Sequence, residues 1–186
     1  MGLRIIGGEL KGKKLKSIPG KLIRPTGNRI REAIFNILSI RVAKAMVLDL
    51  FAGTGALGIE ALSRGAQRAL FVDNGKESLT VLNQNITLCG LGKKADIIRW
   101  DIRRNLNGLK SIGQQFDLIF LDPPYNKNLI TPTLVHIEKS EVLKNNARIV
   151  VEHSVYESLP TDLRAFHITD QRKYGKTLVS FLNYVI

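Results

Sequence analysis

Short apolar runs alternate with helical repeats along most of this chain. The run at 46–51 is apolar except for Asp49, and it leads directly into a glycine-rich turn. Runs of this length between turn residues predict buried strands, whereas apolar residues three and four positions apart predict helices. Strands are therefore expected at 46–51, 69–72, 95–100, 116–121, 148–151, 166–169 and 177–185, and helices at 28–40, 59–64, 77–91 and 128–143. This alternation predicts an α/β fold with a doubly wound, mostly parallel sheet of seven strands.

The first 44 residues follow a different pattern and carry most of the excess charge. Residues 4–16 alternate apolar and polar positions around three glycines, which predicts a hairpin or small twisted ribbon before the helix at 28–40. The chain has a net charge of +12, and residues 1–44 hold 11 Lys and Arg against 2 Asp and Glu, a local charge of +9. We therefore expect a basic extension at 1–44 that contacts nucleic acid, followed by a main domain at 45–186. The alternative is a solvated basic face.

The composition excludes several other classes of protein. No run approaches the roughly 18 apolar residues of a membrane span, and the N-terminus lacks the apolar core of a signal peptide, so a cytoplasmic protein without membrane contact is expected. Cys89 is the only cysteine, which rules out an internal disulfide and offers no metal-ligand cluster. His136, His153 and His167 are scattered and indicate neither a metal site nor a catalytic triad.

The glycines at 53, 55 and 58 have the spacing of a nucleotide-binding loop. Such glycines let the backbone turn tightly and bring its N–H groups close to a ligand. The spacing alone fits nicotinamide, flavin and S-adenosylmethionine (SAM) sites, but the absence of a second phosphate-binding element favours SAM. The expected cofactor contacts are Asp49, Phe51, Ala52, Gly53, Thr54, Gly55, Asp73, Asn74, Asp101 and Ile102.

Two aspartates in that set have specific expected roles. Asp73 lies about 20 residues after the glycine loop, where a carboxylate can accept hydrogen bonds from both ribose hydroxyls of an adenosine. Asp101 can accept a hydrogen bond from the adenine N6 amine, with Ile102 or Trp100 bordering the ring. The alternatives are an aspartate that caps the next helix for Asp73 and an ordinary turn aspartate for Asp101.

The tetrapeptide Asp122-Pro123-Pro124-Tyr125 follows the apolar run at 116–121. An aromatic exocyclic amine is a poor nucleophile because its lone pair is delocalised into the ring. The Asp122 carboxylate and the Pro123 carbonyl can accept its two N–H bonds and absorb charge during methyl transfer. Consecutive prolines fix φ and hold that carbonyl rigidly, while Tyr125 can stack on the base. A proline turn beside a buried tyrosine is the alternative.

A base inside a helix cannot present its amine to such a pocket, so the target must be flipped out or already unpaired. Contacts from the basic extension to phosphates can offset the cost of flipping. Arg24, Arg29 and Arg31 are the main candidates for these contacts, and Lys11 and Lys13 are further candidates. The alternative for the arginines is an intramolecular pair with Glu32.

Over nearly its whole length the chain resembles the RsmD-type bacterial 16S ribosomal RNA (guanine-N2) methyltransferases. The glycine loop and the tetrapeptide are shared by many amino-methyltransferases, whereas the N-terminal signatures are more particular. The matching segments are 4–8 with 11–12, 24–26, 29–36, 49–61 and 122–125.

The resemblance implies a Rossmann-like class I SAM-dependent methyltransferase with an added antiparallel strand and an N-terminal extension that meets RNA. It also implies that the substrate is one guanine of 16S ribosomal RNA, presented in a small-subunit particle. We expect a monomer that needs no metal.

Three other functions stay open. A DNA adenine-N6 methyltransferase would share the tetrapeptide chemistry, but such enzymes usually carry a separate target-recognition region, for which 186 residues leave little room. A nucleic-acid-binding module could keep the fold and lose catalysis. A hydride-transfer enzyme is disfavoured, because it would have no use for residues 122–125.

Overall fold

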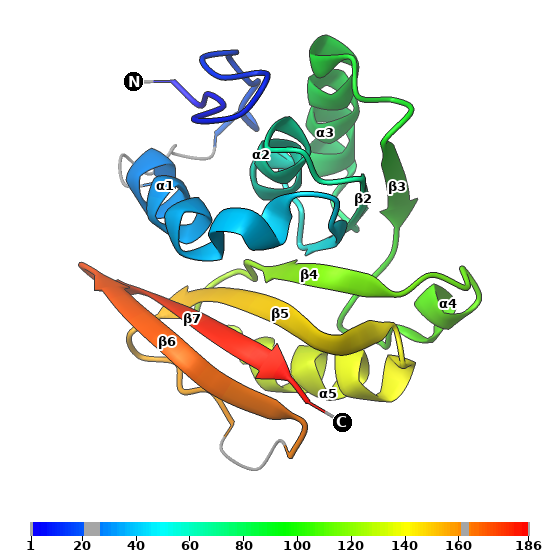
Figure 1. Cartoon of the computed structure of the whole chain (residues 1–186), viewed down its shortest axis with the longest axis vertical. Coiled ribbons are helices and arrows are strands. Elements are labelled where there is room, and N and C mark those ends of the chain that lie inside the picture. Colours follow the sequence, from blue (N-terminus) through cyan, green and yellow to red (C-terminus); the bar gives the residue numbers. More distant parts are fainter. Residues whose placement is uncertain (1, 21–26, 161–163, 186) are drawn as a thin grey trace.

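A computed structural model gives the structure of residues 2–20, 27–160 and 164–185 (Figure 1). Its centre is one seven-stranded sheet in the order β3-β2-β1-β4-β5-β7-β6. The strands are β1 (Met46–Leu50), β2 (Arg68–Asp73), β3 (Ala95–Arg99), β4 (Phe116–Leu121), β5 (Leu143–Ser154), β6 (Phe166–Tyr174) and β7 (Thr177–Tyr184).

The first five strands are parallel, and β7 pairs antiparallel with both β5 and β6. The central strands β1 and β4 are buried almost throughout, as expected for parallel strands covered on both faces. The predicted doubly wound, mostly parallel sheet of seven strands is confirmed, including the antiparallel addition at its C-terminal end.

Helices cover both faces of the sheet (Figure 1). One core cluster joins α1, α2 and α3 to one face, and the other joins α4 and α5 to the opposite face. The helices are α1 (Gly27–Leu38), the 3-10 helix η1 (Ser39–Val42), α2 (Ala56–Ser63), α3 (Lys76–Cys89), α4 (Asn107–Lys110) and α5 (Ile130–Ser140).

Several elements differ in extent from the sequence prediction, and β6, for example, continues to Tyr174 instead of ending at residue 169. The fifth strand begins at Leu143 instead of residue 148, and the helix before it ends at Ser140 instead of residue 143. The reason is an irregular stretch in β5, where four residues at 144–147 lie opposite the single residue Asp117 of β4. This stretch is polar and exposed at 144–146, so the apolar pattern indicates only the regular part of the strand. The short helix α4 was not predicted, because four residues give no periodicity.

The N-terminal residues pack against the sheet domain and share its core. Residues 3–15 form a small antiparallel ribbon in which the Ile5 N–H donates to the Lys13 carbonyl at 2.9 Å and the Leu15 N–H donates to the Leu3 carbonyl at 2.9 Å. Ile5 and Leu15 are buried in the same cluster as Phe35 of α1 and the sheet residues behind it. In the part of the chain that the structure describes, no helix has the length and apolar character needed to span a membrane.

Candidate nucleotide and amine site

The sheet register aligns the predicted site segments along one edge. Leu50 of β1 pairs with Val72 of β2 on one side and with Leu121 of β4 on the other, and Leu121 pairs with Val151 of β5. These four residues form one row across the sheet. The residues that come next in each strand therefore lie side by side at the carboxyl edge: Asp73, Phe51, Asp122 and Glu152. Strand order reverses between β1 and β4, the position where α/β sheets open a ligand crevice.

The glycine loop turns sharply between β1 and α2. Phe51, Gly53 and Gly55 all have left-handed backbones, with φ values of 59°, 56° and 77°. A Cβ at residue 55 would lie 2.4 Å from Cδ1 of Leu82, and one at Gly58 would lie 2.3 Å from Cε1 of Phe71. Gly55 is thus needed for the turn and for close packing, whereas Gly58, inside α2, is needed for close packing alone.

Two aspartates hold this loop by accepting hydrogen bonds from its backbone. Oδ2 of Asp73 accepts from the Gly53 N–H at 2.8 Å, and Oδ2 of Asp49 accepts from the Gly58 N–H at 2.9 Å. Oδ1 of Asp73 also accepts from the Gly75 N–H at 2.8 Å. Each carboxylate oxygen has two lone pairs, so Asp73, which is half-buried at the edge, keeps capacity for further donors.

Asp49 is more deeply buried than Asp73. Only 2% of its surface is exposed. Burial raises the pKa of Asp49 to about 8, with a further contribution from the negative charge of Asp73, while the hydrogen bond from Gly58 opposes the shift. From the sequence, Asp49 could either orient the glycine loop or meet the amino-acid part of the cofactor, and this geometry matches the first role.

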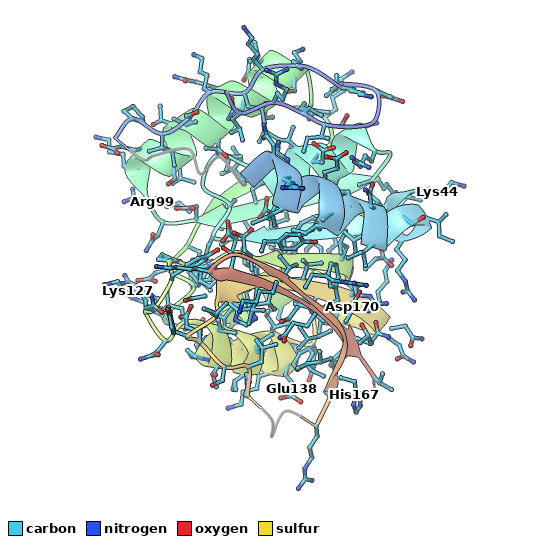
Figure 2. The ribbon with its side chains drawn as sticks, turned by 90° about the vertical axis from the view of Figure 1, so that its left-hand side faces the viewer. Lys44, Arg99, Lys127, Glu138, His167 and Asp170 are labelled. Atoms are coloured by element: carbon cyan, nitrogen blue, oxygen red, sulfur yellow. The ribbon has the colours of Figure 1, made fainter. Side chains whose placement is uncertain are left out.

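A cavity of about 410 Å³ lies beyond the ends of β2 and β3. It is lined by Asn74, Arg99, Trp100, Asp101 and Arg104, so it brings together the predicted residues Asn74 and Asp101. The volume falls within the range of about 300–1,000 Å³ typical of small-molecule sites, which suits an adenosine. Figure 2 shows Arg99 pointing outward on the same side of the molecule as Lys127, which follows the tetrapeptide.

Asp101 forms a paired interaction with Arg103 in this structure. Its two carboxylate oxygens accept from Nε and Nη2 of Arg103 at 2.8 and 2.7 Å, and hydrogen bonding to Arg103 lowers the pKa of Asp101. The neighbouring Ile102 is buried and 2% exposed, so it supports the turn from the core. Of the two predicted residues Asp101 and Ile102, Asp101 is the one that lines the cavity.

The tetrapeptide is fixed to the C-terminal half of the sheet through its tyrosine. The Tyr125 hydroxyl donates to Oε1 of Glu152 at 2.8 Å and lies 3.1 Å from Oγ1 of Thr177, at the start of β7. Burial, with the nearby charges of Glu152 and Asp122, raises the pKa of Tyr125. The phenol is therefore neutral at physiological pH and joins residues 122–125 to both β5 and β7.

Asn85 connects the N-terminal ribbon to the glycine loop, and the sequence analysis did not identify it. Its Oδ1 accepts from the Lys16 N–H at 2.7 Å, while its Nδ2 donates to the Lys16 carbonyl at 3.1 Å and the Thr54 carbonyl at 2.9 Å. The side chain is completely buried. An amide between the apolar residues Leu82 and Ile86 of a helix was the available signal, since a polar residue on the buried face needs partners.

Glu60 is a second buried anchor that the sequence did not reveal. Its two carboxylate oxygens accept from the backbone N–H groups of Ile6 and Gly7, each at 2.8 Å. Oε1 also accepts from Nε of Arg64 at 2.8 Å, and Oε2 lies 3.6 Å from Nε of Arg31. A carboxylate that is 0% exposed thus has four partners from three segments.

Arg31 lies in the interior, which differs from the expectation of an RNA contact. It is 4% exposed and donates to the Arg4 carbonyl and, at 3.0 Å, to Oδ1 of Asn28, in addition to its pairing with Glu60. Burial lowers its pKa. The helical spacing placed residue 31 on the polar side of α1, but the N-terminal ribbon covers that side.

The other predicted RNA contacts are distributed over the extension. Arg29 and Lys11 are exposed and Lys13 is half-buried, whereas Arg24 lies outside the described residues. Within the ranges that the structure describes, no three His, Cys, Asp or Glu side chains converge in a way that could hold a metal ion.

The fold and the edge geometry define a class of protein. Five parallel strands in the order 3-2-1-4-5, followed by an antiparallel hairpin, form the Rossmann-like fold of class I methyltransferases. The solved structure of yhhF from Escherichia coli superimposes with a TM-score of 0.84 at 32% identity, covering 98% of this chain and 97% of that one.

Sequence comparison then gives the family. The family model described as Conserved hypothetical protein 95 matches residues 3–183. Ribosomal RNA small subunit methyltransferase D of Escherichia coli strain K12 is 35% identical over 162 residues, covering 86% of this chain and 78% of that protein. YlbH of Bacillus subtilis, provisionally named an rRNA methyltransferase, is 36% identical over 178 residues, covering 96% of this chain and 97% of that protein. The chain belongs to the ribosomal RNA small subunit methyltransferase D family, as its N-terminal signatures predicted.

Proposed function

We propose that this protein transfers a methyl group from SAM to the exocyclic N2 amine of a guanine in 16S ribosomal RNA of the small subunit. The observation that carries the proposal is the register between β1 and β4, which places the glycine loop and residues 122–125 side by side at the strand-order reversal. Family membership supports the substrate class, because relatives at 35–38% identity are named as methyltransferases of small-subunit ribosomal RNA.

The glycine loop, Asp73 and the adjoining cavity suit the different parts of a SAM molecule. When bound, SAM supplies an electrophilic methyl group. The turn at Gly53 and Gly55 lets the backbone approach a ligand closely. Asp73 has spare acceptor capacity for the ribose hydroxyls, and the adjoining cavity is of adenosine size, with Asn74 and Asp101 in its wall. These contacts would bind and orient the cofactor.

The tetrapeptide side would hold the amine. The Asp122 carboxylate and the Pro123 carbonyl accept the two N–H bonds of the amine, which turns its lone pair away from the ring and stabilises the charge that develops on nitrogen. Such acid–base and electrostatic help is worth about 10²–10⁴-fold in rate. The Tyr125 ring, fixed through Glu152 and Thr177, would provide the surface on which the guanine stacks.

Cations of the N-terminal extension would contact the RNA backbone. Arg29, Lys11 and Lys13 remain candidates for phosphate contacts, with Arg24 as a further candidate outside the described residues. Arg31 instead would hold the extension in place through Glu60. A rigid extension loses less entropy when RNA binds, which leaves more of the contact energy for flipping the target base.

The test is transfer of labelled methyl from SAM, followed by digestion to nucleosides. The substrates are small ribosomal subunits from cells that lack the modification, matching naked RNA and duplex DNA. Label in N2-methylguanosine from either RNA substrate is the expected result. Label in N6-methyladenine from DNA would assign the chain to the DNA adenine methyltransferases, and absence of label despite SAM binding would indicate a silent binding module.

A further inference from the structure

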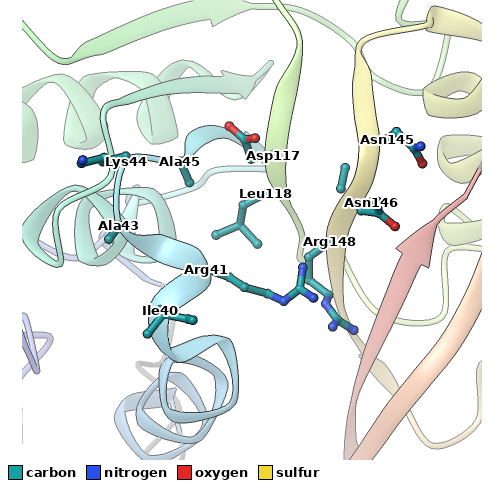
Figure 3. A pocket seen from close by; sticks show the side chains of 11 residues that line it. Ile40, Arg41, Ala43, Lys44, Ala45, Asp117, Leu118, Asn145, Asn146 and Arg148 are labelled. Atoms are coloured by element: carbon teal, nitrogen blue, oxygen red, sulfur yellow. The ribbon is translucent and has the colours of Figure 1, made fainter.

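A second hollow lies at the opposite edge of the sheet, where β4 and β5 begin (Figure 3). Its volume is about 200 Å³, and its wall includes Arg41 of η1, Lys44, and Asn145, Asn146 and Arg148 of β5. This volume is below the range of about 300–1,000 Å³ for sites that enclose a drug-sized ligand, so it suits a small polar group. In Figure 2, Lys44 points outward on the side opposite Arg99 and Lys127.

Two residues of this wall have uncommon backbone conformations. Lys44 and Asn146 are both left-handed, with φ values of 62° and 63°. Asn146 belongs to the irregular stretch of β5 in which residues 144–147 lie opposite Asp117 alone. Left-handed non-glycine residues and strand bulges occur preferentially at functional sites, because they direct side chains that a regular strand would direct elsewhere.

Positive charge dominates the hollow. Arg41, Lys44 and Arg148 line it, against one carboxylate, that of Asp117. That carboxylate is already engaged, since its Oδ2 accepts from Nζ of Lys144 at 2.9 Å and from the Met46 N–H at 2.8 Å. Among the residues that the structure describes, no carboxylate forms an ion pair with Arg41 or Lys44.

Arg148 is held in position beside Arg41. Its Nη1 donates to Oγ1 of Thr169, and the Thr169 hydroxyl in turn donates to the Phe181 carbonyl at 3.1 Å. Figure 3 shows the guanidinium groups of Arg41 and Arg148 next to each other. Burial and the charge of Arg41 lower the pKa of Arg148, while the nearby carboxylate of Asp170 partly opposes the shift. Two adjacent guanidinium groups repel each other, and an anion placed between them would relieve that repulsion.

We propose that this hollow binds one phosphate of the RNA backbone, as a second point of attachment on the far edge of the sheet. This inference rests on the proposed function, because the phosphate would belong to the RNA substrate. Asp122 lies five positions after Asp117, so at about 3.3 Å per strand residue the hollow is roughly 17 Å from the amine site. A folded RNA can span that distance, and the two contacts together would fix its orientation.

The first experiment measures the salt dependence of RNA binding. Arg41→Gln is the informative variant, because Arg41 is exposed and its replacement leaves the core intact. Loss of one phosphate contact should lower the slope of log K against log salt by about 0.7 for single-stranded RNA, with weaker binding at every salt concentration. Lys139→Gln, an exposed cation in the last turn of α5, is the matched control and should leave the slope unchanged. Equal slopes for wild type and Arg41→Gln would overturn the proposal.

The second experiment identifies the source of the phosphate. The Nε–Hε signals of Arg41 and Arg148 are followed by NMR during titration with a 16S ribosomal RNA fragment and, separately, with inorganic phosphate. Movement of both signals with RNA is expected. If the signals move with inorganic phosphate alone, the hollow is a site for small anions and not for RNA. If they move with neither ligand, the hollow binds no phosphate and the proposal is wrong. If wild-type protein methylates no RNA while these signals still move with RNA, the catalytic proposal fails and the phosphate site stands.

Discussion

The glycine loop and the tetrapeptide loop lie side by side but are held in different ways. The glycine loop is fixed by side chains packed beside it: Asp49 and Asp73 accept hydrogen bonds from its N–H groups, and Asn85 donates to the Thr54 carbonyl. The tetrapeptide is fixed by the stiffness of two prolines and by one phenol that reaches β5 and β7. Under the proposed function, the cofactor side would thus be set by the core of the fold, whereas the substrate side would depend on the C-terminal hairpin. Mutations should separate the two sides.

Asp122→Asn should produce the largest effect on methyl transfer. The amide cannot accept charge from the amine as a carboxylate does, so the rate should fall by about 10²–10⁴-fold while SAM affinity stays the same. Single-turnover transfer of labelled methyl measures the rate, and calorimetry measures the affinity. Asp96→Asn, which alters only an exposed pair with Arg68, is the control. Near-normal transfer by a folded Asp122→Asn protein would contradict the assigned role.

Asp73→Ala should act on the cofactor side. Hydrogen bonds to a charged group contribute about 1.5–3 kcal/mol, so the dissociation constant of SAM should rise by about 10- to 100-fold. The methyl transfer rate at saturating SAM should change much less. Titration calorimetry followed by rate measurements over a range of SAM concentrations checks both statements. A lower maximal rate with unchanged SAM affinity would place Asp73 on the substrate side instead.

Gly58→Ala tests whether the glycine loop is set by core packing. The new Cβ would lie 2.3 Å from Phe71, and overpacking of this kind costs about 1–3 kcal/mol of unfolding free energy. Gly92→Ala is the matched control, since nothing lies within 4 Å of a Cβ there. Urea denaturation of both variants gives the comparison. If the two variants are equally stable, Phe71 does not limit the position of the loop.

Tyr125→Phe should have the smallest effect and should be confined to the substrate side. Removal of the hydroxyl breaks the contacts to the Glu152 carboxylate and to Thr177. A hydrogen bond to a charged group contributes about 1.5–3 kcal/mol, and because the ring that stacks on the base is retained, only part of that loss should reach RNA binding. The KM for RNA should therefore rise by roughly two- to tenfold, since each 1.4 kcal/mol is a factor of ten, with no change in SAM affinity. Tyr156→Phe is the control because Tyr156 is 77% exposed. A change in SAM affinity alone would indicate that the phenol supports the cofactor side.

The sequence predicted those features that depend on local pattern. Apolar runs predicted the strands, and the glycine spacing and the tetrapeptide predicted the two loops of the site. The register between β1 and β4 then explains why these two loops lie next to each other. Features that depend on distant partners were missed. Arg31 reads as an exposed cation, yet the ribbon from residues 3–15 covers it. Asn85 and Glu60 bond backbone atoms 31 to 69 positions away in the sequence, and no local signal identifies which partners they bind.

The measurement that tests the account most directly is a titration of SAM into the ¹⁵N-labelled wild-type protein, followed through its backbone amide signals. The account predicts the largest shifts in the glycine loop at 51–55, in the segments 73–75 and 100–102, and smaller shifts around residues 122–125. It predicts no shift at 144–148, in the hollow on the opposite edge. Largest shifts at that hollow, or no shifts at any residue, would contradict the assignment of the carboxyl edge as the SAM site.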